Sequence, residues 1–125
     1  MNLEHVAIWV KDLELMKQFY EKYFNTKVST LYHNDKTGFS SYFLEFESGS
    51  RIELSNKKFL SGHAADALGY AHIAISLGSE EEVDELTERF MQDDFPLLSG
   101  PRTTGDGYYE SVIQDPEGNL IELTV

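Results

Sequence analysis

Two short segments, each holding one potential metal ligand, occur twice in this sequence. His5 opens an apolar run (HVAI), and Glu53 lies further along between two aliphatic residues (IEL). His72 opens a matching run (HIAI), and Glu122 lies in a second IEL. The histidines are 67 residues apart and the glutamates 69. A repeat with so regular an offset predicts two equivalent structural modules.

The first half of the chain has the pattern β-α-β-β-β. Short segments rich in β-formers alternate between apolar and polar residues, as strands do. Between them, apolar residues recur at helical spacing after Asp12, a good N-cap, and the helix ends near Asn25. The expected elements are strands at 3–10, 27–32, 41–46 and 51–55, a turn at 34–38, and the helix.

The second half repeats this order. Ser79 and Glu82 form a capping box that starts a helix, and Pro96 must end that helix because it lacks an amide hydrogen. Its apolar stripe is formed by Val83, Leu86, Phe90 and Met91. The other expected elements are strands at 70–76, 96–99, 108–114 and 119–125, with a loop at 100–107 and a turn at 115–118.

The two halves together predict a single α+β domain of two tandem β-α-β-β-β modules with curved mixed sheets. Module one spans about 1–56, a linker about 57–69, and module two about 70–125. The linker has no clean periodicity, and its composition suggests one short helical turn. A chain of 125 residues can bury one sizeable core.

Side chains alternate between the faces of a strand, so each of the four repeated residues points away from its aliphatic neighbours. The aliphatic side chains would pack on the helices, and His5, Glu53, His72 and Glu122 would line the open face of each sheet. Taken singly, each is a half-exposed strand residue. Their repetition at matched offsets instead predicts a divalent metal site with two nitrogen and two oxygen ligands.

Composition restricts the other functions open to the chain. There are 10 basic and 22 acidic residues, and a net charge of −12 disfavours nucleic acid and anionic membranes as partners. No cysteine is present, which excludes disulfides, thiolate ligands and a cysteine nucleophile. We expect neither a transmembrane helix nor a signal peptide, and a cytoplasmic location fits.

Two stretches resemble a known group of proteins. The segment 115–123 (DPEGNLIEL) is similar to the closing hairpin of the vicinal oxygen chelate superfamily, and the HVAI run followed by a helix to Phe24 is similar to its opening. That superfamily includes glyoxalase I, bleomycin-resistance proteins, fosfomycin-resistance enzymes and extradiol dioxygenases. The resemblance covers nearly the whole chain and implies the glyoxalase/bleomycin-resistance fold.

The resemblance also implies roles for the repeated residues. In this superfamily the first and last strands of each module supply the metal ligands, which here are His5, Glu53, His72 and Glu122. Extradiol dioxygenases and fosfomycin-modifying enzymes lack a ligand corresponding to Glu53, whereas all four are the glyoxalase I pattern. Nitrogen and oxygen ligands of this mix suit nickel, cobalt or zinc.

The implied activity is that of a metal-dependent glyoxalase I-like lyase or isomerase. It would act on a small α-hydroxycarbonyl or thiohemiacetal through a metal-bound enediolate. Glu122 would be the catalytic base, and Glu53 a catalytic ligand that sets charge and geometry. The resemblance further implies a homodimer, and the absence of cysteine means that any thiol comes from a cosubstrate.

Several alternatives stay open at this point. The chain could be a small-molecule binding or antibiotic-resistance protein of the same fold, a thiol transferase or an extradiol dioxygenase. The basic residues that hold glutathione in glyoxalase I have no clear counterpart here. Arg51 and Arg102 are candidates, but the preferred interpretation of each is a surface arginine.

Other residues suggest weaker hypotheses. His33 and His63 fall outside the repeat and are interpreted as ordinary loop or strand-end histidines. Trp9 and Tyr42 either line the site or belong to the core or surface. The segment 105–109 is either a mobile flap or, on the preferred interpretation, a plain hairpin loop.

Overall fold

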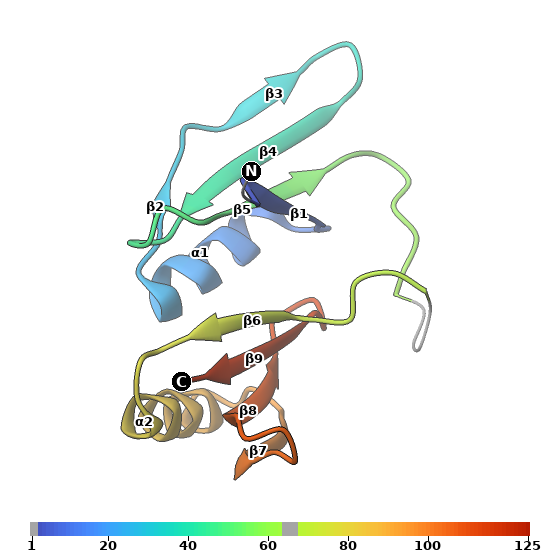
Figure 1. Ribbon diagram of the computed structural model, residues 1–125. Coiled ribbons are helices and arrows are strands. Elements are labelled where there is room, and N and C mark those ends of the chain that lie inside the picture. Colours follow the sequence, from blue (N-terminus) through green and yellow to red (C-terminus); the bar gives the residue numbers. More distant parts are fainter. Residues whose placement is uncertain (1–2, 64–67) are drawn as a thin grey trace. The chain divides into compact units, whose positions relative to one another are not determined.

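The computed structural model describes residues 3–63 and 68–125. The chain divides into two compact units, Met1–His63 and Ala64–Val125, each built from one helix and a mixed sheet (Figure 1). The predicted α+β class is therefore confirmed. Each unit is described by itself below.

The first unit has the element order β-α-β-β-β-β. Its elements are β1 (His5–Trp9), α1 (Leu13–Phe24), β2 (Lys27–Val28), β3 (Tyr32–Asn34), β4 (Phe39–Glu45) and β5 (Arg51–Asn56). The strand order is β1-β5-β4-β2, and β3 also pairs with β4. The first and last strands of the unit, β1 and β5, are parallel neighbours, whereas the other pairs are antiparallel.

Helix α1 forms as the sequence predicts and covers one face of this sheet. The Asp12 side chain accepts a hydrogen bond from the Leu15 amide at 2.9 Å, and Asn25 ends the helix in the left-handed conformation (φ 49°). The side chains that α1 and the facing strands bury are Val10, Met16, Phe19, Tyr20, Tyr23, Tyr42, Leu44, Ile52 and Leu54.

The prediction of a single strand at 27–32 is wrong, because the structure has two short strands, β2 and β3, in that region. Their pairing registers with β4 differ by one residue, so the chain between them holds one residue more than its partner. At the interruption, the Oγ of Ser29 accepts a hydrogen bond from the Phe43 amide at 2.9 Å. The Ser29 hydroxyl therefore accepts the hydrogen bond that a backbone carbonyl would accept in a regular antiparallel sheet.

The second unit has the order β-α-β-β-β. Its elements are β6 (Ile73–Ser76), α2 (Glu80–Gln92), β7 (Leu97–Thr103), β8 (Tyr109–Gln114) and β9 (Leu120–Thr124). The strand order is β6-β9-β8-β7, with β6 and β9 parallel and the other pairs antiparallel. Again the first and last strands of the unit are parallel neighbours.

Helix α2 begins at the predicted cap, where the Ser79 hydroxyl accepts a hydrogen bond from the Glu82 amide at 3.2 Å. The apolar stripe differs from the prediction at one position. Met91 is 53% exposed, while Thr87 is buried. Thr87 can lie in the core because its hydroxyl donates to the Val83 carbonyl and lies 2.6 Å from the Ser111 hydroxyl.

Two strand boundaries in the second half differ from the prediction by more than two residues. Strand β6 begins at Ile73 rather than at residue 70, and β7 continues through the predicted loop to Thr103. The register of β7 with β8 shifts between Leu97 and Ser99 and again between Ser99 and Arg102, the segment that contains Gly100. The sequence predicts one short helical turn in the linker, about 57–69. Residues 57–63 and 68–69 form no helix, and residues 64–67 lie outside the described residues.

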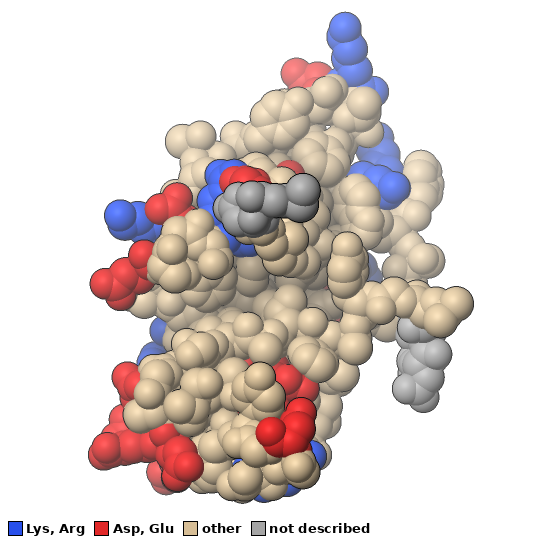
Figure 2. Space-filling view, viewed as in Figure 1, with Lys and Arg blue, Asp and Glu red and all other residues tan. Residues whose placement is uncertain are grey.

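Charge is divided unequally between the units. Residues 1–63 carry eight basic and eight acidic side chains, whereas residues 64–125 carry two and fourteen, so the net charge of −12 belongs to the second unit. Figure 2 shows acidic side chains gathered over α2. In the described part of the chain, neither α1 nor α2 is long and apolar enough to cross a membrane.

Candidate functional site

The first unit brings one predicted histidine and one predicted glutamate together. His5 is the first residue of β1 and Glu53 lies in β5, and the Nε2 of His5 is 3.6 Å from the Oε2 of Glu53. The glutamate side chain is 16% exposed and the histidine side chain 35%. Both therefore lie at a surface that a small ligand can reach.

The second unit contains the same pair. The Nε2 of His72 lies 3.1 Å from the Oε2 of Glu122, with side-chain exposures of 40% and 21%. The sequence predicted His72 within a strand, but it directly precedes β6. Glu122 lies in β9. The repeat seen in the sequence is thus a repeat of local geometry.

Sheet register explains why the pairs are equivalent. In the first unit Ala7 of β1 is the cross-strand partner of Glu53, and in the second Ala74 of β6 is the partner of Glu122. Each histidine lies two positions before that alanine, so it shares the alanine's face of the strand. Parallel pairing of first and last strands therefore brings each histidine to its glutamate.

The predicted separation of faces is also confirmed. Along β1 the even-numbered Val6 and Ile8 are less exposed than His5 and Ala7, and β6 alternates in the same way. In β5 and β9 the aliphatic neighbours of each glutamate are buried. All four polar residues therefore lie on the face opposite the core of their own unit.

In each pair, the distance between the two donor atoms is close to that expected for two ligands of one metal ion. With bonds of about 2.1 Å, two ligand atoms lie about 3.0 Å apart at an octahedral right angle and about 3.4 Å apart at a tetrahedral angle. The observed separations are 3.1 Å and 3.6 Å. One imidazole nitrogen and one carboxylate oxygen are also the donor types that divalent transition metals take.

Each unit supplies one histidine and one glutamate of the repeat. Within residues 3–63, and within residues 68–125, no group of three or more His, Asp or Glu side chains is arranged as a metal site.

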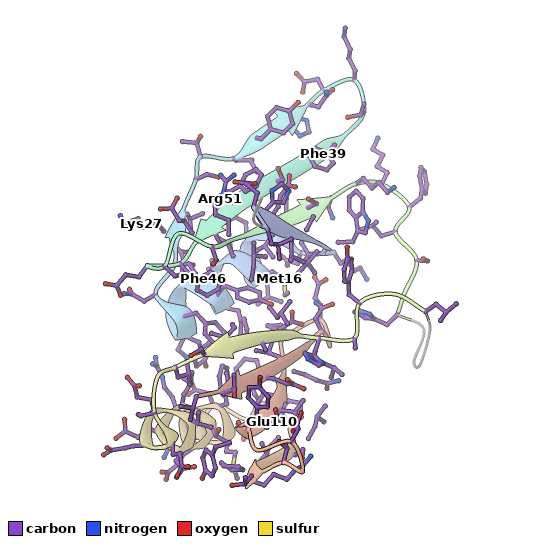
Figure 3. The ribbon with its side chains drawn as sticks, viewed as in Figure 1. Met16, Lys27, Phe39, Phe46, Arg51 and Glu110 are labelled. Atoms are coloured by element: carbon purple, nitrogen blue, oxygen red, sulfur yellow. The ribbon has the colours of Figure 1, made fainter. Side chains whose placement is uncertain are left out.

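The two pairs differ in what surrounds the histidine. The Nδ1 of His5 contacts the carboxylate of Glu4, and that carboxylate also accepts a hydrogen bond from Arg51. The His5 ring packs edge-on against Phe43, with centroids 5.2 Å apart, and the Arg51 guanidinium (labelled in Figure 3) lies 4.5 Å from the Phe43 centroid. These contacts orient the imidazole so that Nε2 faces Glu53.

Glu4 is the residue that the sequence analysis missed. Hydrogen bonds from His5 and then from Arg51 hold the pKa of its carboxyl below the usual range, so it is ionised as an acceptor for the imidazole. Its position next to His5 was a signal, but only the pairing of β1 with β5 shows that Arg51 approaches it. In the second unit the corresponding residue is Ala71.

Glu122 follows a well-ordered turn. The buried Asp115 side chain accepts hydrogen bonds from the Glu117 and Asn119 amides at 3.0 and 2.9 Å, and from the Asn119 side chain at 2.7 Å. Gly118 has the positive φ of 85° that such a turn requires. The turn fixes the register of β9 on β8 and so the position of Glu122.

The two histidines outside the repeat lie apart from these pairs. His33 belongs to β3, where its Nε2 is 3.1 Å from Asp35 and its Nδ1 is 2.6 Å from the Ser40 hydroxyl. His63 is exposed in the segment after β5. The interpretation of both as ordinary histidines stays a prediction.

The candidate arginines and aromatic residues differ in their contacts and exposure. Arg51 is engaged by Glu4 and Phe43, and Arg102 is exposed and donates to the Ser99 hydroxyl at 3.1 Å. Tyr42 is buried on the helix side of its sheet and is therefore not a lining residue, whereas Trp9 is 50% exposed. Trp9 lies on the same face as His5 and Ala7.

The segment 105–109 forms a hairpin connection between β7 and β8. The Gly107 amide donates to the Thr104 carbonyl at 3.0 Å, and the Thr104 amide donates to the Tyr108 carbonyl at 2.8 Å. The Thr104 hydroxyl donates to Asp106 and accepts from the Tyr108 amide. The interpretation as a plain hairpin loop agrees with these bonds.

Comparison with known proteins places the chain in a family. Residues 2–123 match the model of the Glyoxalase/Bleomycin resistance protein/Dioxygenase superfamily. The chain belongs to this superfamily, whose members typically bind a divalent metal ion. No curated protein sequence matches the chain.

Solved structures of similar fold include proteins of different activity. A trypanothione-dependent glyoxalase I of Leishmania major is 25% identical, with a TM-score of 0.80 over 99% of this chain and 86% of the other. The fosfomycin resistance protein FosX of Listeria monocytogenes is also 25% identical, with a TM-score of 0.73 over 99% and 90%. A glyoxalase family protein of Bacillus cereus, 20% identical, has a TM-score of 0.83 over 99% and 93% and agrees in fold.

Proposed function

We propose that this chain is a metal-dependent, glyoxalase I-like lyase or isomerase that acts on a small α-hydroxycarbonyl or thiohemiacetal. Its metal ligands are His5, Glu53, His72 and Glu122. The observation that carries the proposal is the recurrence of one histidine–glutamate pair in both units, at equivalent register and at donor separations of 3.6 and 3.1 Å.

The donor set suits nickel, cobalt or zinc, and two imidazole nitrogens with two carboxylate oxygens leave room in an octahedral shell for substrate. When bound, such an ion supplies Lewis-acid stabilisation of negative charge that develops on substrate oxygens. We infer that the ion is held by both pairs together, either within one chain or across a homodimer in a cytoplasmic setting.

The glutamates then have different tasks. Glu122 accepts the proton from the hydroxyl-bearing carbon beside the carbonyl and returns it to the carbonyl carbon, while the hydroxyl proton passes to the former carbonyl oxygen. One C–H and one O–H bond break, one of each forms, and no electrons are gained or lost overall. Glu53 stays a ligand that sets charge and geometry. A carboxylate can move this proton only if it lies within hydrogen-bond reach of both carbons.

The rest of each site orients these groups. Glu4 and Phe43 hold the His5 ring. The small side chains of Ala7 and Ala74, the cross-strand partners of the glutamates, leave space beside them. Because the chain has no cysteine, a thiol that forms part of the substrate must be brought by the substrate itself.

A fosfomycin-modifying activity is the second candidate, because FosX is as similar in sequence as the Leishmania glyoxalase I. Its type of site needs no ligand at the position of Glu53. The close approach of Glu53 to His5 therefore favours the first candidate.

The experiment is a turnover screen of the metal-reconstituted protein with thiohemiacetals formed from methylglyoxal and several thiols, and with fosfomycin plus thiols or water. We expect isomerisation of at least one thiohemiacetal, lost on chelation and restored by metal. Fully metallated protein that is inactive on every thiohemiacetal but consumes fosfomycin would overturn the first candidate in favour of the second.

A further inference from the structure

Three aromatic rings form a cluster on the open face of the first sheet, here called the aromatic patch: Trp9 of β1, Tyr32 of β3 and Phe39 of β4. The Phe39 ring, labelled in Figure 3, stands between the other two, with centroids 6.1 Å from Trp9 and 6.1 Å from Tyr32. Trp9 is 50% exposed and Tyr32 54%. Trp9 and Tyr32 therefore keep about half of their surface in water, while Phe39, which contacts both, is half-buried.

The patch shares its face with the histidine–glutamate pair of this unit. Trp9 lies two residues beyond Ala7, the cross-strand partner of Glu53. Two residues of a strand span about 7 Å, so the patch begins one side-chain row away from Glu53. The row that Trp9 starts continues across Ser55 and Ser41 to Tyr32, and both serines of this row are buried.

A cation lies beside the patch. The Nζ of Lys57 is 4.5 Å from the centroid of the Trp9 ring. Among the residues that the structure describes, no carboxylate forms an ion pair with Lys57. The first unit is also neutral overall, with eight basic and eight acidic side chains, so its own net charge does not repel an anion near Lys57.

The exposed Trp9 and Tyr32 rings contact Phe39 at interplanar angles of 86° and 57°, and they offer faces and edges to a further ring. The Lys57 ammonium beside the Trp9 ring offers an ionic partner to an acidic group on that further ring. We propose that the aromatic patch with Lys57 binds a flat aromatic ring of the substrate that carries an acidic group. This inference rests on the proposed function and narrows its substrate class to aryl α-hydroxycarbonyl compounds or their thiol adducts.

Trp9 is the only tryptophan of the chain, so its fluorescence reports on the patch directly. The probes are three α-hydroxy acids added to zinc-reconstituted protein: lactate, which lacks the ring, mandelate, which has it, and 4-carboxymandelate, which adds an acidic group to the ring. We expect saturable changes in Trp9 fluorescence with affinity rising in that order.

Variants assign the effect. Phe39→Leu should weaken mandelate binding about threefold to tenfold, because it removes the contact between the Phe39 ring and the ring of mandelate. Lactate binding should be unchanged. Lys57→Met should abolish the preference for 4-carboxymandelate over mandelate. Phe59→Leu, at a phenylalanine that is 98% exposed and outside the patch, is the matched control and should bind all three probes normally.

Equal affinities for lactate and mandelate, or unchanged mandelate binding in Phe39→Leu with a native circular dichroism spectrum, would overturn the inference. So would loss of a dimer in Phe39→Leu by light scattering with mandelate binding intact, because the patch would then be an interface between copies. The proposed function is tested separately. Ring-dependent binding without turnover of any α-hydroxycarbonyl would support ligand binding by the aromatic patch and contradict the proposed enzymatic activity.

Discussion

The two glutamates of the repeat occupy equivalent positions, yet their surroundings differ. Glu53 faces a histidine that Glu4 and Phe43 hold in place, at a donor separation of 3.6 Å. Glu122 faces His72 at 3.1 Å and follows the ordered turn at Asp115. This difference agrees with a structural task for Glu53 and a chemical one for Glu122.

Replacing each glutamate by glutamine separates the tasks. Glutamine keeps an oxygen donor but cannot accept a proton at neutral pH. We expect Glu122→Gln to retain much of its metal and to lose turnover by about 10²-fold or more. Glu53→Gln should lose less at saturating metal. Metal analysis and kinetics on both variants test this, and near-native turnover of fully metallated Glu122→Gln would refute the assignment.

A second residue-scale prediction concerns acid stability. The Tyr42 hydroxyl donates to Glu14 at 2.5 Å and Lys17 lies 2.7 Å from it, and hydrogen bonds from Lys17 and then Tyr42 lower the pKa of the Glu14 carboxyl. A lowered folded-state pKa gives stability that is present above the ordinary carboxyl pKa and is lost as pH falls through the lowered value.

Tyr42→Phe should therefore destabilise the protein at neutral pH, and the difference from wild type should shrink at about pH 3, below an ordinary glutamate pKa of about 4.3. Urea midpoints at both pH values measure it. A difference that stays constant or grows on acidification would show that Glu14 is not responsible.

At the scale of elements, the sequence predicted the helices better than the strands. Both helix starts carry a capping side chain whose role is local, Asp12 and Ser79, so a few residues suffice to locate them. The strand limits depend on partners distant in the sequence. The division between β2 and β3, for example, follows from pairing with β4 and from the Ser29 hydroxyl.

The same distinction applies to the site. The repeat predicted all four candidate ligands because side-chain alternation is a local rule. The contact of Glu4 with Arg51 and the exposure of the Trp9 ring could not be predicted, since both depend on which strands become neighbours and in what register.

Gly100 explains why β7 runs through the loop predicted there. It has φ +80°, and a Cβ at this position would lie 2.4 Å from the Glu110 carbonyl oxygen of the neighbouring strand. Only glycine allows this close approach of β7 to β8.

Gly100→Ala should therefore lower the free energy of unfolding by about 2 kcal/mol or more, because a backbone atom cannot yield as a side chain can. Gly105→Ala is the control, since nothing lies within 4 Å of its added Cβ. Chemical denaturation of both variants is the measurement, and equal stabilities would contradict the close packing of β7 on β8.

The whole molecule is electrically uneven, with the net charge of −12 in the second unit. Repulsion among its carboxylates, gathered over α2 in Figure 2, should make the protein more stable as salt rises, because screening weakens repulsion between exposed charges. We expect the thermal midpoint at neutral pH to increase with sodium chloride. The increase should fade near the sequence pI of 4.6, and a midpoint that drops with salt would indicate that attractive pairs dominate.

The central claim is that His5, Glu53, His72 and Glu122 hold one ion together. Its most direct test is the metal stoichiometry and affinity of protein reconstituted with nickel, cobalt or zinc, compared with an alanine variant at each position. His33→Ala is the matched control, because His33 also lies 3.1 Å from a carboxylate but is outside the repeat. We predict one ion per four-ligand set, weakened by every one of the four substitutions and unaffected in His33→Ala. Two independent ions per chain, or no ion after reconstitution, would contradict the claim.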